Sequence, residues 1–177
     1  MKWIGLLMLY TAFVFLVVVS FWGCKKSVAN PGLGDSYMRY KLNGVKKDYN
    51  GCSAQFLDPI NGIYGVGIAG ASTNDPSNDF SITLFSKTAV SQGTAFGADL
   101  VTGTYFAQAT LAYVEGTKGY GSATTFITPS AKVSVKITEL GSTWVKGNFS
   151  GTLYSDNGTY TTVVYTVTEG EFNAKRN

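Results

Sequence analysis

Histidine is absent from this chain of 177 residues, and only two cysteines are present. Without histidine the chain cannot form a Ser-His-Asp or Cys-His catalytic group, a histidine-ligated zinc or haem site, or a histidine pH switch. Two cysteines are too few for a thiolate zinc or iron–sulfur site. Carboxylates, lysines, tyrosines and hydroxyls remain, so we expect no enzyme, no cofactor and no metal site.

Charged residues are also scarce, at 14% of the chain with a net charge of +3. The basic residues are scattered apart from two pairs, Lys25 with Lys26 and Lys46 with Lys47. This dispersed charge lacks the footprint of a nucleic-acid-binding protein. We expect the first pair to lie in a membrane-proximal stem and the second at the edge of a hairpin.

The long apolar run covers residues 3–22, after Lys2 and before Gly23, Cys24 and two lysines. A short basic start and an apolar core are typical of a secretory signal. The cysteine directly after Gly23 makes the segment resemble a bacterial lipoprotein signal peptide. That resemblance implies that residues 1–23 are removed and that Cys24 is lipidated as the new N-terminus.

Two other interpretations of this run stay open. Phe21 and Trp22 stand where such signals usually have an aliphatic and a small residue. About 20 apolar residues also suffice to span a membrane, so the run could remain as an uncleaved anchor helix. Ordinary secretion is the third interpretation. All three export the domain, and the several lipid chains of a lipoprotein would hold it stably at a membrane.

Residues 24–36 contain two glycines and a proline without periodicity, which predicts a flexible tether. Residues 37–177 form a single β-rich domain in this interpretation, because apolar residues recur with period two. Met38, Tyr40 and Leu42 alternate with polar residues and precede Asn43-Gly44, a hairpin turn signal. Beyond a possible helical turn at residues 91–97, no helical spacing is sustained. We expect an all-β fold, either an antiparallel β-sandwich or a barrel-like meander.

The final third of the chain predicts a three-strand meander. Val145, Phe149 and Leu153 form the inward row of its middle strand. In the last strand the apolar register changes at Glu169-Gly170. A period-two pattern changes face only through an inserted residue, so we expect a glycine-containing bulge there.

Three segments carry a family resemblance: residues 103–105, 145–153 and 167–172, with the sequences GTY, VKGNFSGTL and VTEGEF. They resemble the uncharacterised single-domain β-rich lipoproteins of Bacteroidota, over about residues 37–176. The resemblance implies a β-sandwich or barrel held at a membrane through Cys24, and it supplies no catalytic residue. The absence of acidic residues after Cys24 implies a periplasm-facing location rather than the outer surface.

Four groups of residues are candidates for chemistry. Oxygen-bearing side chains cluster in a segment that suits either calcium or an ordinary turn, namely Asn74, Asp75, Asn78 and Asp79. Cys52 opens a strand and is expected to be a buried, inert thiol. Glu169 and Glu171 resemble a glycosidase pair in spacing, but neighbours on one strand form no cleft, and a solvated edge strand is expected.

Tyrosines are the fourth group, with Tyr105, Tyr113, Tyr120, Tyr154, Tyr160 and Tyr165 in the C-terminal part of the chain. They suit either stacking on sugar rings or ordinary cross-strand packing. Tyr154 and Tyr160 flank an expected turn on the polar register, so we expect them outside the core.

The sequence thus predicts a lipid-anchored protein of the cell envelope that acts as a non-enzymatic binding or scaffold module. Its partners would be the membrane, through the N-terminal lipid, and an envelope protein or glycan. Alternatives are a glycan- or small-ligand-binding lipoprotein, an uncleaved single-pass anchor carrying the β domain, and a hydrolase that uses carboxylates alone.

Overall fold

The computed structural model describes residues 35–71, 77–98, 107–122, 131–155 and 162–177. The chain divides into two compact units, residues 1–31 and residues 32–177, and only the second contains described residues. The expected N-terminal helix, Cys24 and the tether before Asp35 therefore lie outside the described residues. Within the described residues, no helix is long and apolar enough to cross a membrane.

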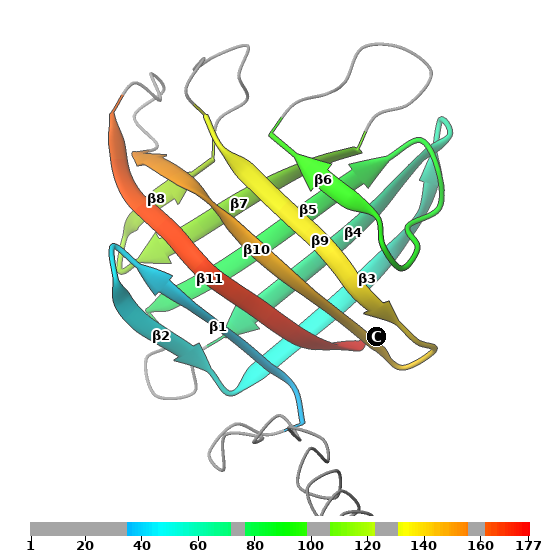
Figure 1. Ribbon diagram of the computed structural model, residues 1–177, viewed down its shortest axis with the longest axis horizontal. Coiled ribbons are helices and arrows are strands. Elements are labelled where there is room, and N and C mark those ends of the chain that lie inside the picture. Colours follow the sequence, from blue (N-terminus) through cyan, green and yellow to red (C-terminus); the bar gives the residue numbers. More distant parts are fainter. Residues whose placement is uncertain (1–34, 72–76, 99–106, 123–130, 156–161) are drawn as a thin grey trace, which may run out of the picture. The chain divides into compact units, whose positions relative to one another are not determined.

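The all-β class is confirmed, because every regular element of the described residues is a strand (Figure 1). In chain order the strands are β1 (Tyr37–Leu42), β2 (Val45–Tyr49), β3 (Gly51–Ile60), β4 (Ile63–Ala71), β5 (Asn78–Ser86), β6 (Ala95–Gly97), β7 (Ala107–Glu115), β8 (Lys118–Gly121), β9 (Val133–Leu140), β10 (Trp144–Ser155) and β11 (Val163–Arg176).

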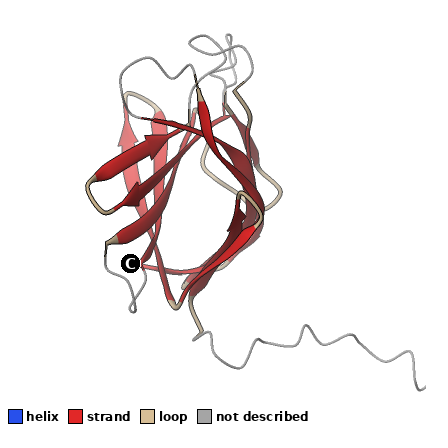
Figure 2. Ribbon diagram, turned by 90° about the vertical axis from the view of Figure 1, so that its left-hand side faces the viewer, coloured by secondary structure: helices blue, strands red, loops and turns tan. Residues whose placement is uncertain are grey.

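These strands form one 11-stranded sheet rather than the two sheets of a sandwich. Its pairings run in a ring, β3–β4–β5–β7–β6–β9–β10–β11 and back to β3, so the described sheet closes on itself (Figure 2). Neighbours are antiparallel except at the two junctions β6–β7 and β11–β3, which are parallel. The expected antiparallel arrangement is wrong at these two junctions, of which β6–β7 joins consecutive strands and β11–β3 joins strands distant in sequence.

Contacts at the end of β11 stabilise its parallel junction with β3. Arg176 donates a hydrogen bond through Nη1 to the carbonyl of Gly141 at 2.8 Å, and its guanidinium lies 4.1 Å from the ring centroid of Phe56 on β3. The backbone N–H of Asn177 donates to the carbonyl of Ala54. Contacts from the last two residues thus tie β11 to β3 and to the β9–β10 hairpin.

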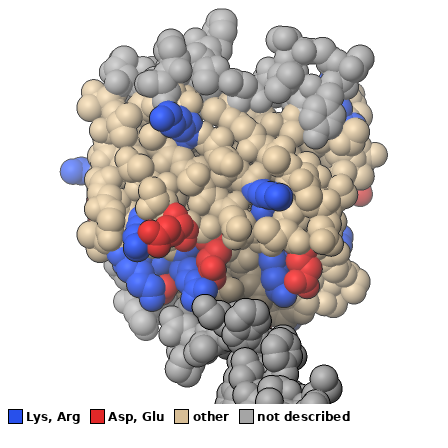
Figure 3. All heavy atoms as spheres, in the orientation of Figure 1, with Lys and Arg blue, Asp and Glu red and all other residues tan. Residues whose placement is uncertain are grey.

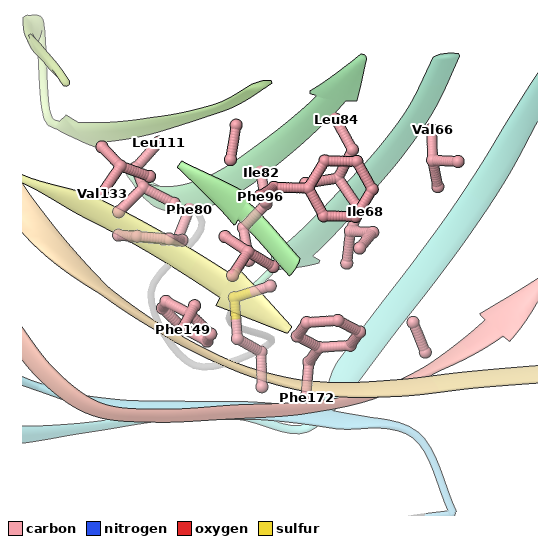
Figure 4. Close-up of a cluster of buried hydrophobic side chains, with 14 of the residues drawn as sticks. Val66, Ile68, Phe80, Ile82, Leu84, Phe96, Leu111, Val133, Phe149 and Phe172 are labelled. Atoms are coloured by element: carbon pink, nitrogen blue, oxygen red, sulfur yellow. The ribbon is translucent and has the colours of Figure 1, made fainter. Parts of the chain in front are cut away.

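Apolar side chains fill the interior of the closed sheet. Inward residues alternate with outward ones along β5, where Phe80, Ile82 and Leu84 are fully buried. They face Phe149 of β10 and Phe172 of β11 across the interior (Figure 4). The ring centroids of Phe80 and Phe149 are 5.3 Å apart. Burial of this apolar surface supplies the main stabilisation of the fold.

Two local predictions from the sequence are confirmed, the β1–β2 hairpin and the bulge in β11. Asn43 and Gly44 have positive φ angles, as the tight hairpin between β1 and β2 requires, and Val45–Tyr49 is the return strand. The bulge is confirmed, because the register of β11 against both β1 and β10 shifts at Glu169-Gly170. No helix forms at residues 91–97, the site of the possible helical turn: the N–H of Thr94 donates to the carbonyl of Ser91 in a turn, and Ala95–Gly97 is a strand.

Candidate functional site

Cys24, the one site residue that the sequence assigns, lies outside the described residues. Cys52 is buried on β3, and burial raises the pKa of its thiol to about 12. The thiol therefore stays protonated at neutral pH and is a poor nucleophile. No cluster of three or more acidic or cysteine side chains that could hold a metal occurs among the described residues.

Only part of the segment that suits either calcium or an ordinary turn can be placed. Asn74 and Asp75 lie outside the described residues, whereas Asn78 and Asp79 open β5. The hydroxyl of Tyr113 donates to Oδ1 of Asn78 at 3.3 Å. Consecutive strand residues point to opposite faces, so Asn78 and Asp79 do not converge on one point.

Five of the described tyrosines form an interior pair and a cluster in which Tyr113 is buried and Tyr120 and Tyr165 are half-buried. Tyr40 and Tyr49 share a buried hydrogen bond of 3.0 Å between their hydroxyls, and burial together with that bond raises the pKa of Tyr40. Tyr113, Tyr120 and Tyr165 bring their rings together from β7, β8 and β11, with centroids 4.9–6.0 Å apart.

Glu115 accepts a hydrogen bond from the hydroxyl of Tyr165 at 2.8 Å. The hydroxyl of Tyr113, which donates its proton to Asn78, lies 3.5 Å from Glu115. The bond to Glu115 raises the pKa of Tyr165, and burial is the main cause of the raised pKa of Tyr113. The rings pack against one another and the core, so cross-strand packing accounts for these tyrosines.

The expectation that Tyr154 lies outside the core is wrong, because its side chain is fully buried. The register of β10 against β11 shifts between Leu153 and Tyr154, and both residues are buried in succession. Tyr154 packs with Ala131 in a small separate cluster. Tyr105 and Tyr160 lie outside the described residues.

Glu169 and Glu171 are neutralised by cations of β1. Lys41 Nζ lies 2.7 Å from Glu169, and Arg39 forms an ion pair with Glu171. The expected edge strand is wrong here, because β11 lies between β1 and β10 at this point. The edge is β2, which pairs with β1 and carries Lys46 and Lys47, as expected for a hairpin edge.

A trough on the outer surface, lined by polar side chains with apolar residues between them, was not predicted. It consists of two adjoining hollows of about 610 Å³ and 460 Å³ that share Ser134 and Ser150. Cross-strand neighbours from β9, β10 and β11 line it, with Ser134 opposite Ser150 and Thr152 opposite Thr166. Its polar side chains are those of Lys132, Ser134, Lys136, Asn148, Ser150, Thr152, Thr166, Thr168, Glu169 and Glu171.

Small residues are prominent in the lining of the trough. Gly97, Ser134, Ser150 and Gly151 all line it, and small residues leave space on a sheet surface. On the same face the charged side chains gather around β1, β2 and the adjoining part of β11, and much of the remaining surface is uncharged (Figure 3). The signal in the sequence was the polar register of β10, Asn148-x-Ser150-x-Thr152, beside Thr166-x-Thr168.

A second, apolar hollow of about 340 Å³ lies at the β3–β4 hairpin. Leu57, Ile60 and Ile63 line it, and Ile60 is 72% exposed.

Comparisons of the chain with protein-family models, with curated proteins and with solved structures found no match.

Proposed function

We propose that this protein is an exported, lipid-anchored protein of the cell envelope whose barrel-like β domain binds a ligand and catalyses no reaction. The apolar run and Cys24 support the anchor, and the periplasm-facing location follows from the residues after Cys24. The protein then acts at the membrane, through binding rather than chemistry.

The observation that carries the binding role is the trough across β9, β10 and β11, with its rows of outward-facing polar side chains. A hydroxyl group both donates and accepts hydrogen bonds, as sugar hydroxyls do. The trough offers such groups at Ser134 and Ser150, which lie opposite each other, and along β11 at Thr166 and Thr168, whereas the Thr152 hydroxyl already bonds to the backbone of Lys132. A hydroxyl-rich ligand, and therefore a glycan, fits this surface best.

The candidate reactive groups give no comparable support for an enzyme. Cys52 is a buried thiol, and Glu169 and Glu171 are held in ion pairs with Lys41 and Arg39. A carboxylate acid–base pair needs two groups that converge on a cleft from opposite sides. Glu169 and Glu171 instead lie two residues apart on one strand.

The anchor is tested by the intact mass of the protein recovered from membranes, compared with that of a Cys24→Ser variant. A wild-type species that lacks residues 1–23 and carries acyl chains, absent from the variant, is the expected result. A full-length unmodified mass would show that the segment is an uncleaved anchor instead.

Binding is tested with the full-length protein in detergent on an array of neutral and acidic glycans. We expect retained glycans, and a loss of at least fivefold in affinity for the variant Thr166→Val/Thr168→Val, which removes two trough hydroxyls and keeps the shape. Thr83→Val/Thr110→Val is the matched control, because Thr83 and Thr110 are cross-strand neighbours on β5 and β7 outside the trough. Binding to no glycan would overturn this role.

The scaffold role is the second candidate, and the apolar hollow at the β3–β4 hairpin favours it. Exposed Leu57, Ile60 and Ile63 would suit an apolar protein surface. If the protein is a scaffold, in-cell crosslinks to a defined envelope protein should disappear in an Ile60→Ser/Ile63→Ser variant. Unchanged crosslinks would argue against this surface.

A further inference from the structure

Lys132 and Lys136 differ from the other basic residues around the trough. Arg39 and Lys41 are paired with glutamates, and Lys146 lies 2.7 Å from Glu139. Among the described residues no acidic side chain forms an ion pair with Lys132 or Lys136, although both line the trough. The trough therefore carries positive charge that the described domain does not neutralise.

The two lysines are set apart along one extended segment, with Lys132 directly before β9 and Lys136 within it. Positions 132, 134 and 136 alternate with buried positions, so the side chains of Lys132, Ser134 and Lys136 leave the same face. Four residues of extended chain span about 13 Å. A compact anion would not contact both ammonium groups with extended stems, whereas a chain with repeated negative charges would.

The other polar residues of the trough suit contacts with a polysaccharide chain. Asn148 lies between Lys136 and Glu171 in the cross-strand register, and Ser150 lies opposite Ser134. The hollows are open along the sheet, whereas a small ligand is normally enclosed over most of its surface. The glutamates at one end are already compensated by Lys41 and Arg39, so they add little net repulsion.

We propose that the trough binds a linear anionic polysaccharide, a polyuronate type of chain, with its carboxylates at Lys132 and Lys136 and its hydroxyls at the serine and threonine rows. This inference rests on the proposed binding function and names the ligand class of the same site. Ionic attraction would supply affinity that weakens with salt, and the hydroxyl rows would set the position of the chain.

The test measures binding of polygalacturonate and of the neutral polymer dextran to the full-length protein in detergent, at low and at high salt. The variant Lys132→Ala/Lys136→Ala should lose at least tenfold in affinity for polygalacturonate at low salt. Lys47→Ala/Lys118→Ala is the matched control, since it removes the same charge at exposed or half-exposed positions outside the trough. We expect it to lose less than twofold.

Each outcome separates the ligand class from the binding role. Equal losses in the two double variants would assign the attraction to net charge, and absent polygalacturonate binding in the wild type would also overturn the inference. If dextran binds, and only Thr166→Val/Thr168→Val weakens it, the binding role stands and the anionic ligand is wrong. If neither polymer nor any arrayed glycan binds, both proposals fail. A Lys132→Arg/Lys136→Arg variant should retain polygalacturonate binding, which shows that charge at these positions is the requirement.

Discussion

The two faces of the sheet formed by β9, β10 and β11 have opposite chemistry. Inward residues such as Val135, Phe149 and Phe172 are buried among apolar neighbours. Outward residues such as Ser134 and Ser150 are polar and line the trough. Because successive strand residues point to opposite faces, the same strands carry the core and the candidate site, and substitutions on each face should affect different properties.

The largest expected effect comes from adding one carbon to the inner face. A Cβ at Gly147 would lie 2.5 Å from the carbonyl oxygen of Lys136 and 2.5 Å from Cζ of Phe172. Overpacking of this kind costs about 1–3 kcal/mol, or more where backbone must move. We expect Gly147→Ala to lower the melting temperature by roughly 5–10 °C, measured by circular dichroism.

Gly67→Ala is the control for this substitution. Gly67 lies on β4, and a Cβ there would meet no atom within 4 Å. Its melting temperature should stay within about 2 °C of the wild-type value, because a change in an open position costs little. Equal losses in both variants would mean that the close contacts at Gly147 do not set the cost of its substitution.

The sequence indicated features that depend on local chemistry. Asn43-Gly44 requires positive φ angles at two successive residues, and the change of apolar register at Glu169-Gly170 requires an inserted residue. Both were found where predicted. The inward row of Val145, Phe149 and Leu153 was also found, because period two reports burial of one face.

Features that depend on distant segments were missed. The parallel junction of β11 with β3 joins Lys175 to Ser53, and no local pattern specifies it. Tyr154 was misplaced because a register shift buries two successive residues. The trough needs the outer rows of three strands side by side, and the sequence shows each row but not their shared hollow.

Deprotonation of the buried Cys52 thiol should reduce the stability of the folded domain at alkaline pH. Burial raises the pKa of Cys52 to about 12, above its ordinary value. The unfolded chain then loses the thiol proton at lower pH than the folded domain, so stability falls as pH rises from about 9 toward 12. Each pH unit in this window costs roughly 1 kcal/mol for one such group.

Urea unfolding of the full-length protein in detergent at pH 8 and pH 10 checks this effect. The wild type should lose roughly 1 kcal/mol or more of unfolding free energy between the two values. A Cys52→Ala variant is the control, and it should lose less over the same interval because it lacks the thiol. The raised pKa of Tyr40 predicts a further loss above pH 10 in both proteins. Identical slopes would show that Cys52 does not contribute.

The smallest expected effect lies on the outer face, at the bulge of β11. Glu169 has a φ of +52°, a region that costs a side chain about 1 kcal/mol and costs glycine little. Its ion pair with Lys41 is exposed and stabilises by less than about 1 kcal/mol. We therefore expect Glu169→Gly to be more stable than Glu169→Ala by about 1 kcal/mol, since both variants lose the ion pair and only glycine relieves the backbone.

At Glu171, on the same strand, we expect the opposite order of stability for the alanine and glycine variants. Glu171 is absent from the residues with positive φ in the described chain, so glycine has no backbone advantage there. Glu171→Ala should be more stable than Glu171→Gly, because glycine loses more conformational freedom on folding. Unfolding free energies of the four variants measure this reversal. If alanine were the more stable residue at both positions, the positive φ at Glu169 would cost the folded domain no measurable free energy.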